Sequence, residues 1–231
     1  AGALLLMLVT LIPIKIPGLI KEKMPDFDWK SVKEVFVFIK KSPVMSSLIL
    51  LDFTATFFGS ATSLLPIFAV EILKTDSSGL GLLYAADSLG GVAAGIVLSS
   101  FKKVNHQGKI IVGAVLIYGL STVVFGLSSS FLITCFALMA IGASDMTSTI
   151  LRNNIRQLMT PDHLRGRVTG MNILFAQGGP KLGDAESGIL ASAISAPAAV
   201  VIGGVGSIIS TILIAVRFKK LLRYKGEETG L

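Results

Sequence analysis

Long apolar runs separated by short polar segments dominate the sequence. A helix needs about 20 mostly apolar residues to cross a bilayer, and six runs meet this requirement. They cover residues 45–73, 79–101, 109–128, 131–151, 167–192 and 197–218. A seventh run, residues 1–14, is apolar from its first residue and too short to span, so we interpret it as the end of a helix that begins outside this sequence. The pattern predicts an all-α polytopic membrane protein.

Residues 15–44 form the one sizeable segment between apolar runs. From Trp29 onward, apolar residues recur at helical spacing and charged residues, mostly lysines, take the other side. The apolar positions are Trp29, Val32, Val35, Phe36 and Ile39. This pattern is typical of a basic helix in the membrane interface, with anionic lipid as its partner; docking onto a protein surface is the alternative. Pro43 is expected to end the helix before the next span.

The positions of the basic residues predict the orientation of the chain. All but two of the 21 lysines and arginines fall in four segments, 15–41, 102–109, 152–167 and 217–225. Six alternating spans put these segments on one side, which the positive-inside rule makes cytoplasmic. The connections on the other side, 75–78, 128–130 and 195–197, are too short to hold a binding domain.

We therefore expect four parts in a multi-pass protein of the cytoplasmic membrane. Residues 1–14 end a transmembrane helix, and residues 15–44 are a cytoplasmic loop with an amphipathic helix. Residues 45–218 form a bundle of six transmembrane helices, and residues 219–231 are a cytoplasmic tail.

Composition agrees with a membrane protein, because 52% of the residues are hydrophobic and only 15% are charged, against about 25% charged in soluble domains. The net charge of +7 does not indicate nucleic-acid binding, since the basic residues lie between apolar runs instead of on one soluble surface. The single cysteine, Cys135, excludes a disulfide within the chain. Soluble enzymes and nucleic-acid-binding proteins are thus poor interpretations.

Ionisable residues within spans are costly and usually face a cavity or a partner. Six such residues are Asp52, Asp87, Asp145, Lys181, Asp184 and Glu186. Asp52 begins a helical stripe of small or polar residues, namely Ala55, Thr56, Gly59, Ser60 and Ser63. Such a stripe either lines a water-filled path for substrate or proton or lets a neighbouring helix approach closely. For Asp52 the sequence leaves both a cavity role and a hydrogen bond to another helix open.

Asp145 lies nearer the basic end of its span, on a stripe with Gly142, Ser148, Thr149 and Arg152. This position favours a cytoplasmic gate or an ion pair with Arg152 over central substrate binding. Asp87 is followed by Gly91 and Gly95, a G-x-x-x-G pair that predicts close helix packing on that face.

The run 167–192 carries the densest charge of any predicted span. Lys181 and Asp184 are three residues apart and can pair, and Gln177 extends their face. We expect this face to line the substrate or proton cavity. Glu186 shares the opposite, small-residue face with Gly179 and Gly183, a pattern that indicates contact with another helix. Because Pro removes a backbone donor, the Gly178-Gly179-Pro180 run is expected to bend or loosen the helix, as a hinge or as a static kink.

Several chemistries are not supported by the sequence. Both histidines, His106 and His163, fall in predicted cytoplasmic loops, so no intramembrane metal site is visible. The chain has no phosphate-binding G-x-x-x-x-G-K-[ST] motif, and its Asp87 and Asp145 contexts miss the motifs of intramembrane aspartyl proteases. We expect no cofactor and no enzymatic activity.

Three stretches resemble the major facilitator superfamily, in its enterobactin-exporter-like branch. They are Asn154–Val168, Gly178–Gly188 and Ala199–Gly204. The resemblance implies that the six spans are helices seven to twelve, that residues 1–14 end the sixth, and that residues 15–44 are the central loop. It implies the C-terminal half of a secondary active transporter, which moves a small molecule by alternating access and is often proton-coupled and an exporter. The missing N-terminal half would be its partner.

The resemblance also places the run around Thr160–Arg167 in the cytoplasmic loop between helices ten and eleven. There Asp162 is placed to cap a short loop helix, while Arg156, Arg165 and Arg167 would brace a cytoplasmic gate. The alternative is a non-transporting membrane scaffold, in which the buried charges only pack helices.

Overall fold

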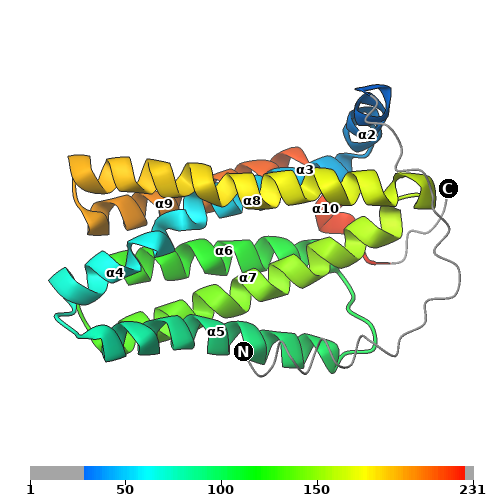
Figure 1. The fold of residues 1–231 in the computed structure, drawn as a ribbon. Coiled ribbons are helices and arrows are strands. Elements are labelled where there is room, and N and C mark those ends of the chain that lie inside the picture. Colours follow the sequence, from blue (N-terminus) through cyan, green and yellow to red (C-terminus); the bar gives the residue numbers. More distant parts are fainter. Residues whose placement is uncertain (1–28, 227–231) are drawn as a thin grey trace, which may run out of the picture.

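The computed structural model describes residues 29–226, and every regular element in that range is helical. The elements are α2 (Trp29–Lys41), α3 (Pro43–Gly59), the 3-10 helix η1 (Ser60–Leu64), α4 (Leu65–Ile67), the π-helix η2 (Phe68–Ile72), α5 (Ser77–Ser99), α6 (Gln107–Leu127), α7 (Phe131–Met159), α8 (Asp162–Ala193), α9 (Ala196–Arg217) and α10 (Lys219–Arg223) (Figure 1). The predicted helix end at 1–14, most of the loop before Trp29 and the last residues of the tail lie outside the described residues.

Five helical segments in the described range are long and apolar enough to cross a membrane. They are Pro43–Ile72, Ser77–Ser99, Gln107–Leu127, Phe131–Met159 and Ala196–Arg217, so the prediction of an all-α polytopic membrane protein is confirmed. The sixth expected span, 167–192, lies in α8, which has ample length but carries Lys181, Asp184 and Glu186. Figure 1 shows α8 running the length of the bundle beside α9, and its crossing of the membrane stays a prediction.

Local capping explains where several helices begin. The Ser42 side chain accepts a hydrogen bond from the Met45 N–H, and Pro43 starts α3 where a missing N–H costs nothing. Asp76 caps α5 by accepting from the Gly79 N–H, and Ser195 caps α9 in the same way. Each of these three helices thus begins after a connection of only a few residues.

The predicted loop at 152–167 is wrong. α7 continues to Met159 and α8 begins at Asp162, so only Thr160 and Pro161 connect them. The last third of α7 is polar, so apolarity fades before the helix ends, yet buried Leu151 and Ile155 anchor this part to the bundle. Asp162 therefore begins a long helix instead of capping a short one, in a first turn where a carboxylate is favoured by the helix dipole.

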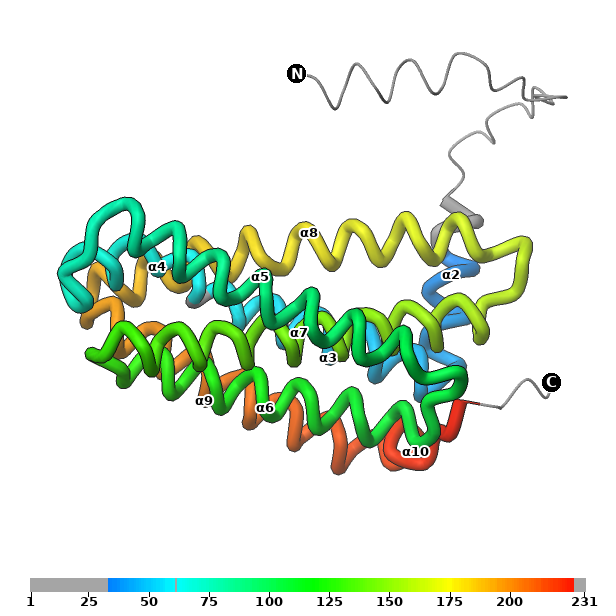
Figure 2. Tube along the Cα trace, turned by 90° about the horizontal axis from the view of Figure 1, so that it is seen from below, coloured from blue at the N-terminus to red at the C-terminus, as the bar shows by residue number. Residues whose placement is uncertain are grey.

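The helices pack in a continuous order around the bundle. α5 packs along α7, α7 along α6, α6 along α9, and α3 lies against both α8 and α9 (Figure 2). One apolar cluster surrounds Phe68 and Phe125, whose ring centroids are 4.5 Å apart. A second cluster joins Leu51, Ile111 and Leu221 near the other end of the bundle.

The basic segments gather at one end of the bundle. Figure 1 shows α2, α10, the connection from α5 to α6 and the turn from α7 to α8 at the same end. The Gly108 N–H donates to the Tyr224 carbonyl at 3.4 Å, which joins the start of α6 to the chain after α10. Spans that alternate in direction were predicted to place the basic segments on one side, and this arrangement agrees with that prediction.

The predicted amphipathic helix corresponds to α2, which ends before Pro43 as expected. Its buried residues Val35 and Ile39 pack with Leu164 and Val168 at the start of α8. Glu34 also accepts a hydrogen bond from Arg167 of α8 at 3.1 Å. This face of α2 thus packs against its own chain, while lipid contact of the helix and docking to another protein both stay predictions.

Different glycines from those expected bring α5 and α7 together. A Cβ on Gly95 would meet nothing within 4 Å, and one on Gly91 would make only ordinary contact with α7. By contrast, a Cβ on Gly90 would lie 1.9 Å from the Met139 carbonyl oxygen, and one on Gly142 would lie 2.0 Å from the Asp87 carbonyl oxygen. The sequence showed a glycine-rich face, but not which glycines touch backbone.

We expect Gly90→Ala to destabilise the protein by about 1–3 kcal/mol, because the added methyl group collides with backbone that cannot rotate away. Denaturation of the purified protein in detergent would measure the change. Gly95→Ala is the matched control on the same helix and should leave stability unchanged or slightly raised. Equal losses for the two variants would contradict this packing.

Candidate functional site

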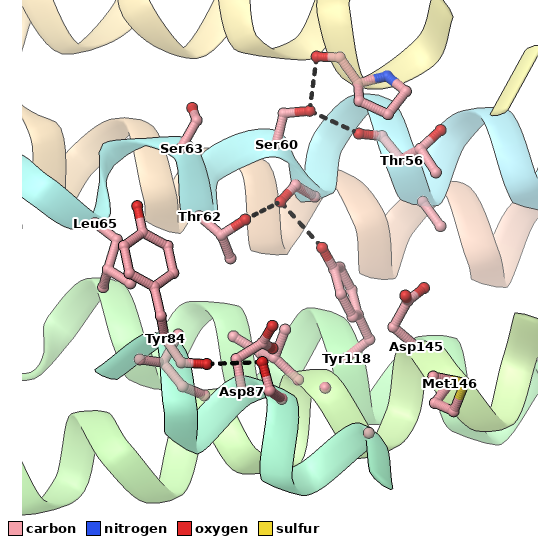
Figure 3. Close-up of a pocket in the computed structure, with 18 of the residues that line it drawn as sticks. Thr56, Ser60, Thr62, Ser63, Leu65, Tyr84, Asp87, Tyr118, Asp145 and Met146 are labelled. Carbon is pink, nitrogen blue, oxygen red and sulfur yellow. Dashed lines mark hydrogen bonds between the residues drawn. The ribbon is translucent and has the colours of Figure 1, made fainter. Parts of the chain in front are cut away.

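A cavity of about 690 Å³ lies between α3 with η1, α5, α7 and α8, and Tyr118 of α6 also lines it (Figure 3). Its polar lining consists of hydroxyl and carboxyl groups. These are Thr56, Ser60, Thr62, Ser63, Tyr84, Asp87, Ser88, Tyr118, Asp145 and Asp184. No basic side chain is among the described residues that line this cavity. It is an acidic, hydroxyl-rich space in the middle of a membrane bundle.

The stripe predicted on α3 forms one wall of the cavity. All five of its small or polar residues, Ala55, Thr56, Gly59, Ser60 and Ser63, line the space. At Gly59 the chain changes from α-helix to 3-10 helix. The Gly59 carbonyl there accepts a hydrogen bond from the Tyr118 hydroxyl at 3.0 Å, which ties α3 to α6 (Figure 3).

A second hydrogen bond ties α3 to α8. The Ser60 hydroxyl lies 3.0 Å from the Pro180 carbonyl oxygen and 2.9 Å from the Thr56 carbonyl oxygen, so it can donate to either. Nearby, a Cβ on Gly183 would lie 2.1 Å from the Phe57 carbonyl oxygen, and one on Gly179 would lie 2.5 Å from the Thr56 Oγ1. These glycines therefore let α8 approach α3 closely.

The carboxylates of the cavity come from three helices. Asp87 of α5 and Asp145 of α7 project from neighbouring helices, as Figure 3 shows. Asp184 of α8 lies 3.8 Å from Lys181, the pairing that their spacing allows. The Lys181 side chain is 84% exposed and lies outside the cavity.

A smaller cavity of about 240 Å³ adjoins the first, and Thr56 and Asp145 line both. Asp52, Arg152 and Arg156 meet in its wall. Arg152 Nη2 lies 3.0 Å from Asp52 Oδ1, and Arg156 Nη1 lies 3.8 Å from Asp52 Oδ2. The Arg152 side chain is only 3% exposed, so this ion pair is buried between α3 and α7.

The two arginines also make hydrogen bonds within α7. Arg152 donates to Thr149 Oγ1 at 3.0 Å, and Arg156 donates to Asn153 Oδ1. The ion pair considered between Asp145 and Arg152 does not form among the described residues, because Arg152 instead meets Asp52. Of the two interpretations left open for Asp52, the polar contact with a neighbouring helix is present, and Asp52 also lines the smaller cavity.

The remaining candidates lie away from both cavities. Arg165 pairs with Asp162 at 2.8 Å on the exposed start of α8, and Arg167 pairs with Glu34. Gln177 is exposed and Glu186 is half-buried on α8, and neither lines a described cavity. The helix α8 runs without interruption through Gly178-Gly179-Pro180, and the bend expected there, as a hinge or as a static kink, stays a prediction.

Sequence reasoning missed several uncharged polar residues of the site, among them Tyr84, Tyr118 and Asn172. Each is an uncharged polar side chain inside an otherwise apolar helical run. Only ionisable residues were selected as costly in the membrane, although an amide or phenol buried in lipid also needs a partner. A search for every mid-span hydrogen-bonding group would have found them.

Comparison with known proteins identifies the family of this bundle. A model of the family MFS_3, described as transmembrane secretion effector, matches residues 6–228. The chain belongs to the major facilitator superfamily. The resemblance seen around 154–204 thus extends over nearly the whole sequence.

The relatives within this superfamily include named exporters. The chain is 25% identical over 219 residues to the enterobactin exporter EntS of Citrobacter koseri, and 24% identical to that of Escherichia coli O81. Each match covers 94% of this chain and 52% of the relative. The chain therefore spans about half the length of the relatives that it matches.

Proposed function

We propose that the chain is the C-terminal half, with the central loop, of a secondary active transporter that exports a small molecule by alternating access. The observation that carries this proposal is the 690 Å³ cavity, which polar groups of six helical elements line at the middle of apolar helices. Such groups are costly in a membrane unless they face water, a ligand or each other. An N-terminal half would complete the cavity, since alternating access needs two bundles that move against each other.

The direction and the coupling follow from separate observations. The matched relatives are named as exporters and the family as secretion effectors, which favours export. Asp87 and Asp145 face the cavity without a basic residue beside them in its lining. Carboxylates in such a position can take up and release protons, so we propose a proton as the coupling ion.

The proposed orientation places the basic end of the bundle in the cytoplasm. The segments that gather there hold nearly all lysines and arginines of the residues that the structure describes, and such segments stay on the cytoplasmic side. The protein would lie in the inner membrane with its C-terminus inside, and anionic lipid would contact the exposed basic face of α2.

Ser88→Trp in the full-length protein is expected to slow export at least tenfold while leaving the protein folded. Ser88 lines the cavity and is exposed to it, so an indole there fills space that the substrate needs. Export would be measured from cells that express the full-length protein, against a panel of small molecules that includes enterobactin. Ser100→Trp, at the exposed end of the same helix and outside the cavity, is the matched control.

Normal export by the Ser88→Trp variant would show that the substrate does not pass through this cavity. If the unaltered protein exports no compound of the panel with a proton gradient present, the transporter proposal fails. The interpretation as a non-transporting membrane scaffold then takes its place.

A further inference from the structure

The smaller cavity contains a buried guanidinium with an unused donor. Arg152 uses Nη2 for both Asp52 and Thr149, while its Nη1 is buried and has no hydrogen-bond partner among the described residues. A buried donor of a charged group without a partner costs more than a typical hydrogen bond contributes. Arg152 also lines the cavity, so a small shift of its guanidinium would bring this donor to a ligand bound there.

A second unused polar atom lies in the same wall. Asn172 of α8 lines the smaller cavity, and its Oδ1 is buried without a hydrogen-bond partner in the described part of the chain. Its side-chain amide also carries donors, and amide orientation adapts to the partner. Arg152 and Asn172 thus offer hydrogen bonds to one group from two helices.

The cavity wall holds two arginines and two aspartates, and these charges are unevenly distributed. Asp52 alone is shared by Arg152 and Arg156, so one positive charge near it has no matching carboxylate. Asp145 is the other acidic residue of the wall; it forms no ion pair with either arginine in the described range and is exposed towards the larger cavity. The positive charge is thus concentrated on the side of Arg152 and Arg156.

We propose that this smaller cavity is a subsite for an anionic oxygen group of the substrate, of which a carboxylate is the simplest. One oxygen would accept from Arg152 Nη1, and Asn172 would donate to the other. Charge-assisted bonds of this kind are short and about twice as strong as neutral ones. This inference rests on the proposed function, because it names the chemistry of a substrate that the larger cavity admits.

Binding of benzoate to the purified full-length protein tests the subsite without any transport step. Benzoate should raise the melting temperature in a saturable manner, since a ligand that binds only the folded state stabilises it. Benzamide has nearly the same shape and no charge, and it should bind at least tenfold more weakly. Equal effects of the two probes, or no effect of benzoate, would overturn the proposal even if export is observed.

Two variants test whether the rise in melting temperature comes from benzoate bound in this cavity. Asn172→Asp places a carboxylate beside Arg152 and should abolish the benzoate shift, whereas Asn154→Asp makes the same change on the exposed side of α7 and should leave it intact. If Asn172→Asp does not fold, Asn172→Leu serves instead. This variant keeps the Asp52 ion pair and should lower the affinity for benzoate at least threefold. An unchanged benzoate shift in the folded Asn172 variant would contradict the assignment.

Discussion

Asp52→Ala is expected to destabilise the protein by about 3–5 kcal/mol, because it leaves the guanidinium of Arg152 buried without its carboxylate. Arg152 is 3% exposed, so its charge would remain in a largely dehydrated site between α3 and α7. Denaturation of the purified protein in detergent measures the loss. Among the substitutions considered for this chain, this one should have the largest effect on stability.

Two further variants separate the buried ion pair from charge effects in general. The double variant Asp52→Leu with Arg152→Met removes both charges and should recover most of the stability, since apolar replacements of a buried pair are often neutral. Glu34→Ala breaks the exposed pair with Arg167 and should cost at most about 1 kcal/mol. If Asp52→Ala is no worse than Glu34→Ala, the buried pair does not hold α3 to α7.

The sequence was informative where one helix carries the whole pattern. The stripe from Ala55 to Ser63 lies on one continuous helical segment, α3 with η1, so its spacing alone predicted a polar face, and that face lines the larger cavity. Four of the helical segments were predicted to within a few residues for the same reason, since a long apolar run and its caps are local features, whereas the run that begins at Phe131 continues as helix to Met159, eight residues past its predicted end.

The sequence was uninformative where two distant segments meet. Asp52 and Arg152 lie one hundred positions apart, so nothing in their local context indicates that they form an ion pair. Helix spacing instead suggested Asp145 as the neighbour of Arg152. Likewise, the glycines of α5 looked alike in sequence, and only the crossing of α7 distinguishes Gly90 from Gly95.

α8 shows a further limit of apolarity as a criterion. Its charged residues make it too polar to qualify by composition, yet it lies among the spans and lines the cavity with Pro180 and Asp184. A helix that faces water on one side does not need an apolar surface all round. Its 32 residues extend over about 48 Å at 1.5 Å per residue, which exceeds the hydrocarbon core of about 30 Å.

The crossing of α8 is the point on which the transporter depends, because without it the larger cavity lacks a wall. Single cysteines at the two ends of α8, His163→Cys and Ser195→Cys, would be placed in the full-length protein with Cys135 and any other native cysteine replaced. Labelling intact cells with a membrane-impermeant thiol reagent then reports which end faces the outside medium.

We expect an all-or-none difference in labelling between these two cysteines in intact cells. Ser195→Cys should be labelled in intact cells, and His163→Cys should be labelled only after the membrane is opened. Labelling of both positions from the same side would show that α8 does not cross the membrane, and labelling in the reverse order would show that the basic end faces outward; either result would contradict the account.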